Sequence, residues 1–226
     1  MSNAAQRDVQ QFRTRLDDPR FPCVGAKSAM AGGHLDFVMA GDLCVANGDS
    51  ALVKRLQEFA ATTRSDALFT SQLALYPDTP FLNEAQFEWA LWQRLQAMHE
   101  LDAPSHGWDA SVSNDPQSPE FSLSIGGRGF YIVGLHPGSS RPARRFHCAA
   151  LVFNLHSQFE VLRSDGRYDK LRAAITERDV VYSGSSNPMM AMHGDASEAR
   201  QYSGRQVDDS WRCPFSAVAT GAADDP

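Results

Sequence analysis

The chain has 226 residues, of which 42% are hydrophobic and 21% are charged, a composition typical of one globular domain and unlike that of disordered or fibrous proteins. It carries 21 Lys and Arg against 27 Asp and Glu, a net charge of −6, which argues against a nucleic-acid partner. No apolar run approaches the ~20 residues of a membrane helix, and the N-terminus has no apolar signal core, so we expect a cytoplasmic protein with no membrane partner.

Hydrophobic spacing predicts four elements in the first third of the chain. A sparsely apolar helix over residues 3–16 should lie on the body of the protein as an extension that spans residues 1–20. A strand is predicted at 34–40, a helix at 50–63 and a second strand at 67–76.

The clearest helix covers residues 84–101, with Asn83 as its N-cap. Placing residues at 100° intervals puts His99 on an apolar arc, so the histidine should point toward the core. The other members of this arc are Phe87, Leu91, Trp92, Leu95, Met98 and Leu101. The stretch 103–120 then reads as a long loop, anchored by Trp108, that borders a site.

The second half of the chain begins with two strands, at 121–125 and 129–135, joined by a Gly126-Gly127 turn. A third strand near 148–155 should be followed by helices at 157–163 and 168–182, and residues 183–226 should be mostly irregular. Because the strands cluster instead of alternating with helices, we predict a single α+β domain. Its central, mostly antiparallel sheet should be packed with helices and followed by an irregular C-terminal segment.

Several common chemistries lack their motifs. There is no phosphate-binding loop, no H-E-x-x-H pair and no G-x-S-x-G elbow. The four cysteines, Cys23, Cys44, Cys148 and Cys213, are scattered without a C-x-x-C pair, so zinc is not indicated and each is expected to be a buried, reduced thiol.

One unusual block follows the strand at 129–135. His136 is succeeded within ten residues by two serines and three arginines: Ser139, Ser140, Arg141, Arg144 and Arg145. Arginine forks and serine hydroxyls suit a carboxylate or phosphate. The competing interpretation is a solvated basic turn.

His99 has two interpretations as well. A histidine on an apolar helix face is commonly a core residue, but Asp102, three positions later, is placed to accept its second ring proton and so to make it a better metal or haem ligand. His136, His156 and His193 are alternative ligands. His34, His106 and His147 read as surface or strand residues.

Seven blocks, in order, resemble the YqcI/YcgG family over about residues 21–215, which leaves residues 216–226 as a frayed tail. The blocks are Phe21-Pro22-Cys23, Met98-His99-x-x-Asp102, Gly134-Leu135-His136-Pro137-x-Ser139-Ser140-Arg141-x-Ala143-Arg144-Arg145-Phe146, Phe153-Asn154-x-His156-x-Gln158-Phe159-Glu160, Ser186-Asn187-Pro188-Met189, Glu198-Ala199-Arg200-Gln201-Tyr202-Ser203-Gly204 and Trp211-x-Cys213-Pro214-Phe215.

That family includes haem-dependent N-hydroxylases of guanitoxin-type biosynthesis. The resemblance implies haem b, O2, an external electron donor and a small amine or guanidine substrate that is hydroxylated on nitrogen. It further implies His99 as the leading axial ligand, supported by Asp102, with His136 as the second candidate. His136 and His156 would act as catalytic residues. The haem propionates would be bound by Ser139, Ser140, Arg141, Arg144 and Arg145.

Two other functions remain open at this point. A cytoplasmic haem carrier or sensor would show the same ligand and propionate features without turnover. A metal-free protein that binds carboxylates through the arginine turn is the third possibility. Neither the substrate nor the oligomeric state is indicated by the residues.

Overall fold

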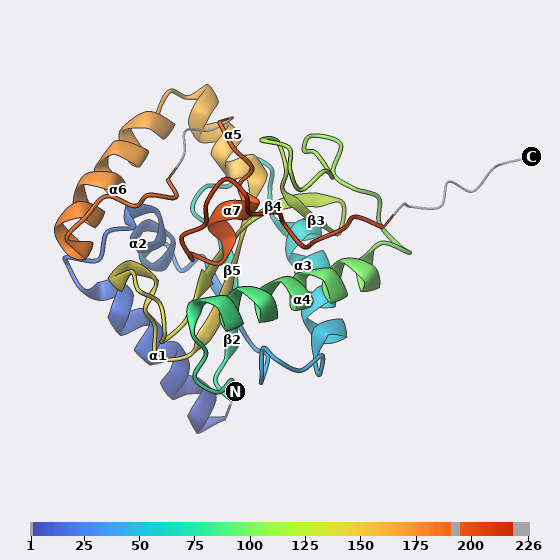
Figure 1. The fold of residues 1–226 in the computed structure, drawn as a ribbon, viewed down its shortest axis with the longest axis horizontal. Helices are drawn as coiled ribbons and strands as arrows, with labels where there is room; N and C mark the ends of the chain where they lie inside the picture. The colour runs from blue at the N-terminus through green and yellow to red at the C-terminus, as the bar shows by residue number, and fades with distance from the viewer. Residues whose placement is uncertain (1, 191–194, 219–226) are drawn as a thin grey trace, which may run out of the picture.

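The computed structural model describes residues 2–190 and 195–218, and these residues form an α+β domain around one five-stranded sheet (Figure 1). The strand order is β1-β2-β5-β4-β3, in which β1 and β2 are parallel and every other pairing is antiparallel. The prediction of a mostly antiparallel sheet packed with helices is therefore confirmed. The strands are β1 Leu35–Met39, β2 Ser71–Tyr76, β3 Leu123–Ile125, β4 Arg128–Leu135 and β5 Ala149–Leu155.

Helices cover both faces of the sheet, and the alternation of side chains along each strand fills two cores. Along β2, Ala74 and Tyr76 face the core beneath α3 and α4, whereas Leu73 and Leu75 face the core beneath α1. Figure 1 shows these two helical layers on opposite sides of the strands. The helices are α1 Asn3–Asp17, α2 Val24–Ala31, α3 Asp49–Thr62, α4 Glu84–Asp102, α5 His156–Ser164, α6 Tyr168–Ser183 and α7 Ala199–Tyr202, with a 3-10 turn, η1, at Pro142–Arg144.

Helix α4 carries the predicted N-terminal cap, because Asn83 and Gln86 form a reciprocal capping box. His99 and Trp92 are buried as predicted, but Leu101 is 46% exposed. Leu101 points in nearly the same direction as the buried residues Ala90 and Arg94, but it lies in the last turn of the helix.

The β3–β4 hairpin turns at Gly126 and Gly127, which have φ values of 61° and 70°. Positive φ at both central residues is the geometry of a type I′ turn, so the predicted glycine hairpin is confirmed.

One predicted boundary was wrong, and two helices were not predicted. The stretch after residue 21 contains α2, whose first turn is capped by the Cys23 thiol at 3.4 Å from the Ala26 amide. The second strand begins four residues later than expected, at Ser71, and a short helix, α7, interrupts the irregular C-terminal segment. Cys44 is exposed and Cys23 half-buried, whereas Cys148 and Cys213 are buried, and all four are free thiols.

The N-terminal helix is an integral part of the fold. Val9, Phe12 and Leu16 of α1 are buried in the second core, where Phe12 stacks on Phe146 with ring centroids 4.5 Å apart. The predicted tail begins with residues 216–218, which are part of the described structure, and residues 219–226 lie outside it.

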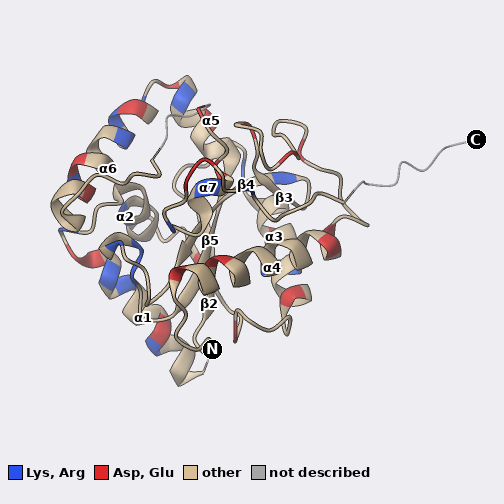
Figure 2. Ribbon diagram, viewed as in Figure 1, with Lys and Arg blue, Asp and Glu red and all other residues tan. Residues whose placement is uncertain are grey.

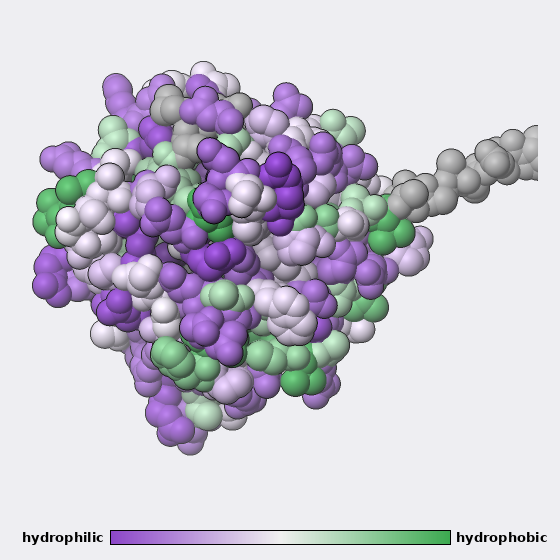
Figure 3. Space-filling view, in the orientation of Figure 1, coloured by the Kyte–Doolittle hydropathy of each residue, from purple (hydrophilic) through white to green (hydrophobic). Residues whose placement is uncertain are grey.

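Charges of both signs are interspersed over the helices (Figure 2), and hydrophilic side chains cover most of the face shown in Figure 3. Within the described ranges, none of the helices is long and apolar enough to cross a membrane.

Candidate functional site

The C-terminal end of α4 and the loop that follows it enclose a cavity of about 330 Å³. This is the loop that was expected to border a site. Trp108 anchors it by packing against His99, with ring centroids 5.3 Å apart. The described lining residues are His99, Asp102, His106, Gly107, Trp108, Asn114, Ser124, Ala217 and Val218.

His99 is 3% exposed, and its two ring nitrogens have different surroundings. Nε2 accepts a hydrogen bond of 2.9 Å from the Val218 amide. Burial lowers the pKa of His99 below its ordinary value, against smaller opposing effects of Asp102 and Glu100. The ring is therefore neutral at pH 7 with its proton on Nδ1, which has no hydrogen-bond partner in the described part of the chain. Leaving such a buried donor unpaired costs about 1–3 kcal/mol.

Asp102 does not accept the second ring proton of His99, contrary to the sequence expectation. Its carboxylate accepts hydrogen bonds from Gln57 Nε2 at 2.8 Å and from the Gly126 amide at 2.9 Å, and it lies 3.0 Å from His106 Nδ1. Because α4 ends at Asp102, this side chain faces the next turn of the chain, where the His106 amide bonds back to the Asp102 carbonyl. His106, expected at the surface, is thus half-buried in the cavity wall.

His136 lies at the other end of α4. Its ring stacks on Phe87, with centroids 4.1 Å apart and planes 13° apart, and the residue is 1% exposed. Burial lowers its pKa to about 4, so the ring is neutral at pH 7. Phe87 and His99 are twelve residues apart on the helix, which separates them by roughly 18 Å. His99 and His136 therefore do not belong to one site.

Arg144 of the predicted anion turn is buried against the main chain. Its guanidinium donates to the carbonyls of Gly134 at 3.0 Å, Gln201 at 3.0 Å and Tyr202 at 3.2 Å. These contacts join the end of β4 to α7. Arg144 thus holds the C-terminal segment against the sheet through hydrogen bonds.

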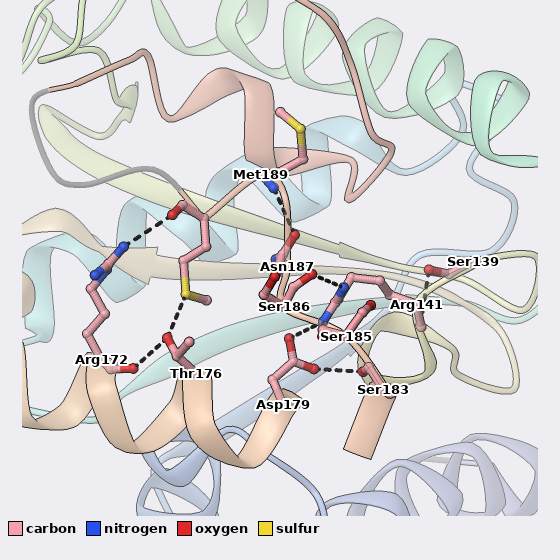
Figure 4. Close-up of polar contacts among 11 residues, drawn as sticks. Ser139, Arg141, Arg172, Thr176, Asp179, Ser183, Ser185, Ser186, Asn187 and Met189 are labelled. Atoms are coloured by element: carbon pink, nitrogen blue, oxygen red, sulfur yellow. Dashed lines mark hydrogen bonds and ion pairs between the residues drawn. The ribbon is translucent and has the colours of Figure 1, made fainter. Parts of the chain in front are cut away.

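Arg141 makes a second set of contacts between the turn and the C-terminal half of the chain, shown in Figure 4. Its guanidinium lies 2.5 Å from Asp179 Oδ2, an ion pair in which both side chains are largely buried, and it also donates to the carbonyls of Ser185 and Ser186. The end of α6 and the segment that follows are thereby held against the turn.

The remaining residues of the turn bond mostly to one another. Arg145 donates to the carbonyls of Ser139 and Ser140, and the Ser139 hydroxyl donates to the Arg141 carbonyl at 3.3 Å. The Ser140 hydroxyl donates to Glu84 at 2.7 Å. These serines and arginines are therefore together in space, as expected, but they are bound to protein groups and lie away from His99.

His156, at the start of α5, occupies a third location. Its Nδ1 lies 3.0 Å from Ser122 Oγ and its Nε2 lies 2.9 Å from Glu160 Oε1. Ser122 is also 3.2 Å from Glu198 Oε2, so a half-buried carboxylate belongs to the same cluster. This arrangement is suited to moving a proton.

The structure includes site residues that sequence reasoning missed, namely His106, Asn114, Ser122, Ser124 and Glu198. Only Glu198 carried a signal, since it opens one of the quoted blocks. Cys213 is buried in the core, and burial raises its pKa to about 12. His193 lies outside the described residues, and the described residues contain no group of three or more His, Cys, Asp or Glu side chains positioned to hold a metal ion.

Comparison with known proteins gives one match. The model of the family described as "YqcI/YcgG family" matches residues 12–216, which is most of the chain. The match begins within α1 and ends at the segment beside His99. No curated protein and no solved structure matches.

Proposed function

The chain belongs to the YqcI/YcgG family, and from this premise we propose that it is a haem-dependent oxygenase that hydroxylates the nitrogen of a small amine or guanidine. Haem b, when bound, would supply the activation of O2. The reaction also needs an external electron donor. The family resemblance supports the proposed class of reaction. The surroundings of His99 support the proposed location of the site.

The single observation that favours the His99 cavity is the state of the His99 ring. The imidazole is neutral, it is held by Trp108 and Phe215, and it lines a cavity. An axial ligand needs a free lone pair on a neutral ring, which Nε2 would offer once it is released from Val218. Among the described residues, Nδ1 has no hydrogen-bond partner. His99 is therefore our axial ligand.

The arginine turn does not fit the propionate role that the resemblance implied. Arg141, Arg144 and Arg145 are bound to protein carbonyls and to Asp179, at the opposite end of α4 from His99. The described residues that line the cavity include no arginine and no lysine. We assign the turn a structural role and expect donors such as Asn114 and Ser124 to meet polar groups of the ligand.

Asp102, His106 and Trp108 would position the substrate. An amine or guanidine is a cation at pH 7, and the cavity wall offers one carboxylate and one indole ring. A buried carboxylate and the face of a tryptophan both favour a cation. Asp102 is itself fixed by Gln57 and Gly126, so it is held in place before the substrate arrives.

A haem sensor is the second candidate, and one contact favours it. Iron bound at Nε2 would replace the Val218 amide as the partner of His99, so haem binding would release the segment at residues 216–218. That segment is otherwise tied to α4 by two hydrogen bonds between Gln96 and Ser216. A carrier or sensor would couple haem occupancy to this release.

Turnover separates the two candidates. Protein reconstituted with haem should be supplied with O2, a reductant and a panel of small amines and guanidines, and the N-hydroxylated product measured by mass spectrometry. Product that depends on both haem and O2 supports the oxygenase. Stoichiometric haem without product from any member of the panel would favour the sensor.

A further inference from the structure

Ser122, His156, Glu160 and Glu198 form a chain of polar side chains that the proposed axial site does not use. Ser122 is fully buried, His156 is 6% exposed, and Glu160 is at the surface. The contacts run from Glu160 to His156 at 2.9 Å, from His156 to Ser122 at 3.0 Å and from Ser122 to Glu198 at 3.2 Å.

The number of protons in this chain follows from its contacts. Ser122 has one hydroxyl proton, so it can donate either to Glu198 or to His156 Nδ1, but not to both. If Ser122 donates to an ionised Glu198, Nδ1 must donate to Ser122. Nε2 must also be protonated, because it faces the Glu160 carboxylate, and His156 is then an imidazolium.

The alternative arrangement has the same total number of protons. If Ser122 donates to Nδ1, the imidazole is neutral, and Glu198 must be protonated in order to donate to Ser122. The two arrangements differ by the transfer of one proton. Both satisfy the three contacts that link Glu160, His156, Ser122 and Glu198.

We propose that Glu198, Ser122 and His156 form a proton relay in which a single proton is shared between the carboxyl group and the imidazole. In one direction Glu198 gives its proton to Ser122 Oγ while the original Ser122 proton passes to His156 Nδ1. The reverse transfer restores the first arrangement. No atom or electron is gained or lost in either direction.

The surroundings of Glu198 favour its protonated form, and the groups that face the relay are Arg163, Glu160 and two tyrosines. Burial raises the pKa of Glu198 to about 7, with smaller lowering effects of Ser122 and Arg163 and a raising effect of Glu160. Burial also raises the pKa of Glu160, but Arg163 and His156 outweigh it and hold that pKa below its ordinary value. Tyr202 and Tyr131 pack nearby with pKa values raised by burial, so both hydroxyls stay protonated.

The relay lies beside the cavity. Ser122 directly precedes β3 and Ser124 lies within it, and residues two positions apart along extended backbone are about 7 Å apart on the same side. Ser124 lines the cavity at His99. Hydroxylation of nitrogen by O2 with release of water consumes two protons and two electrons. If the proposed function holds, the relay would supply these protons from the surface at Glu160.

The ring nitrogens of His156 report the sharing directly. In protein carrying 15N-labelled histidine, the His156 resonances, assigned with a His156→Asn variant, should move in two steps with pH, because the ring and Glu198 titrate as a coupled pair. Glu198→Gln and Ser122→Ala should each reduce this to one step. Arg145→Ala, which lies in the arginine turn and contacts none of the relay residues in the described part of the chain, is the control and should keep both steps.

A single step in the wild-type protein that Glu198→Gln leaves unchanged would overturn the relay. This measurement needs neither haem nor turnover, so its outcome is independent of the proposed function. Circular dichroism and the melting temperature check that each variant is folded.

The link to the reaction is tested in the holoenzyme. Ser122→Ala should lower kcat at least tenfold and leave KM for the amine unchanged, since the Ser122 hydroxyl does not line the cavity. An unchanged kcat would overturn the assignment of the relay to this reaction. Wild-type protein that binds no haem would refute the proposed function instead and leave the nitrogen titration as it is.

Discussion

Val218 donates its main-chain N–H to Nε2 of His99 at 2.9 Å, across 119 positions of sequence. This contact occupies the lone pair that we assign to the haem iron. It also explains the protonation of His99, because a ring that accepts at Nε2 holds its proton at Nδ1.

Removing the Val218 N–H should strengthen haem binding. Proline has no amide proton, so Val218→Pro frees Nε2 from a bond worth about 0.5–1.5 kcal/mol, and haem affinity should rise roughly 2- to 13-fold. Val218→Ala keeps the N–H and is the matched control. Equal haem dissociation constants for the two variants would show that the contact does not compete with the ligand.

Arg144→Ala should destabilise the protein without affecting haem. The substitution removes the guanidinium donor from three carbonyls in part-buried contacts, those of Gly134, Gln201 and Tyr202. We expect a loss of about 2–4 kcal/mol in the free energy of unfolding and a fall in the melting temperature of roughly 2–4 °C for each kcal/mol.

Arg145→Ala is the comparison within the same turn. Among the described residues, the Arg145 side chain bonds only to carbonyls five and six residues earlier, so its loss should cost less than that of Arg144. If Arg144→Ala instead keeps the wild-type melting temperature and raises either the haem dissociation constant or KM, the turn is an anion site after all.

His136 should contribute to acid sensitivity. Its pKa is about 4 in the folded protein and near 6.5 in the unfolded chain, so the unfolded state binds more protons between these values. Stability is therefore fully present above pH 6.5 and decreases as the pH falls toward 4, by about 3 kcal/mol for this group.

His136→Phe tests this by keeping the stacking on Phe87 while removing the titrating ring. Urea unfolding at pH 7 and pH 4.5 should show a smaller loss in the variant than in the wild type. Burial also lowers the pKa values of His99 and His147. These two histidines contribute equally to the loss of stability at low pH in the variant and in the wild type, so the difference between the two proteins reports on His136. An equal loss in the two proteins would contradict the assignment to His136.

Local patterns predicted the elements that have strong local signals. The capping box at Asn83, the helical arc of α4 and the Gly126-Gly127 turn are short-range features, and each was found where expected. Helix α2 was missed because its N-cap is a cysteine and its sequence is rich in small residues with little apolar periodicity.

The contacts that define the site depend on long-range packing, which no spacing rule reveals. Arg144 meets Tyr202 across 58 positions, and Ser122 meets Glu198 across 76. The three arginines were correctly predicted to lie in one turn, but their partners are groups of the protein itself, such as the Asp179 carboxylate for Arg141 and main-chain carbonyls for Arg144. Asp102 was expected to pair with His99 by helical spacing, whereas the chain after the helix brings His106 to it.

The most direct test of the central claim is a haem titration of the purified protein, followed by absorbance. We expect a Soret band that saturates at one haem per chain, is lost or shifted to the spectrum of an exchanged ligand in His99→Ala, and is retained in His136→Phe. Absence of a Soret band in the wild-type protein would contradict the account. So would a band that survives His99→Ala unchanged and disappears in His136→Phe.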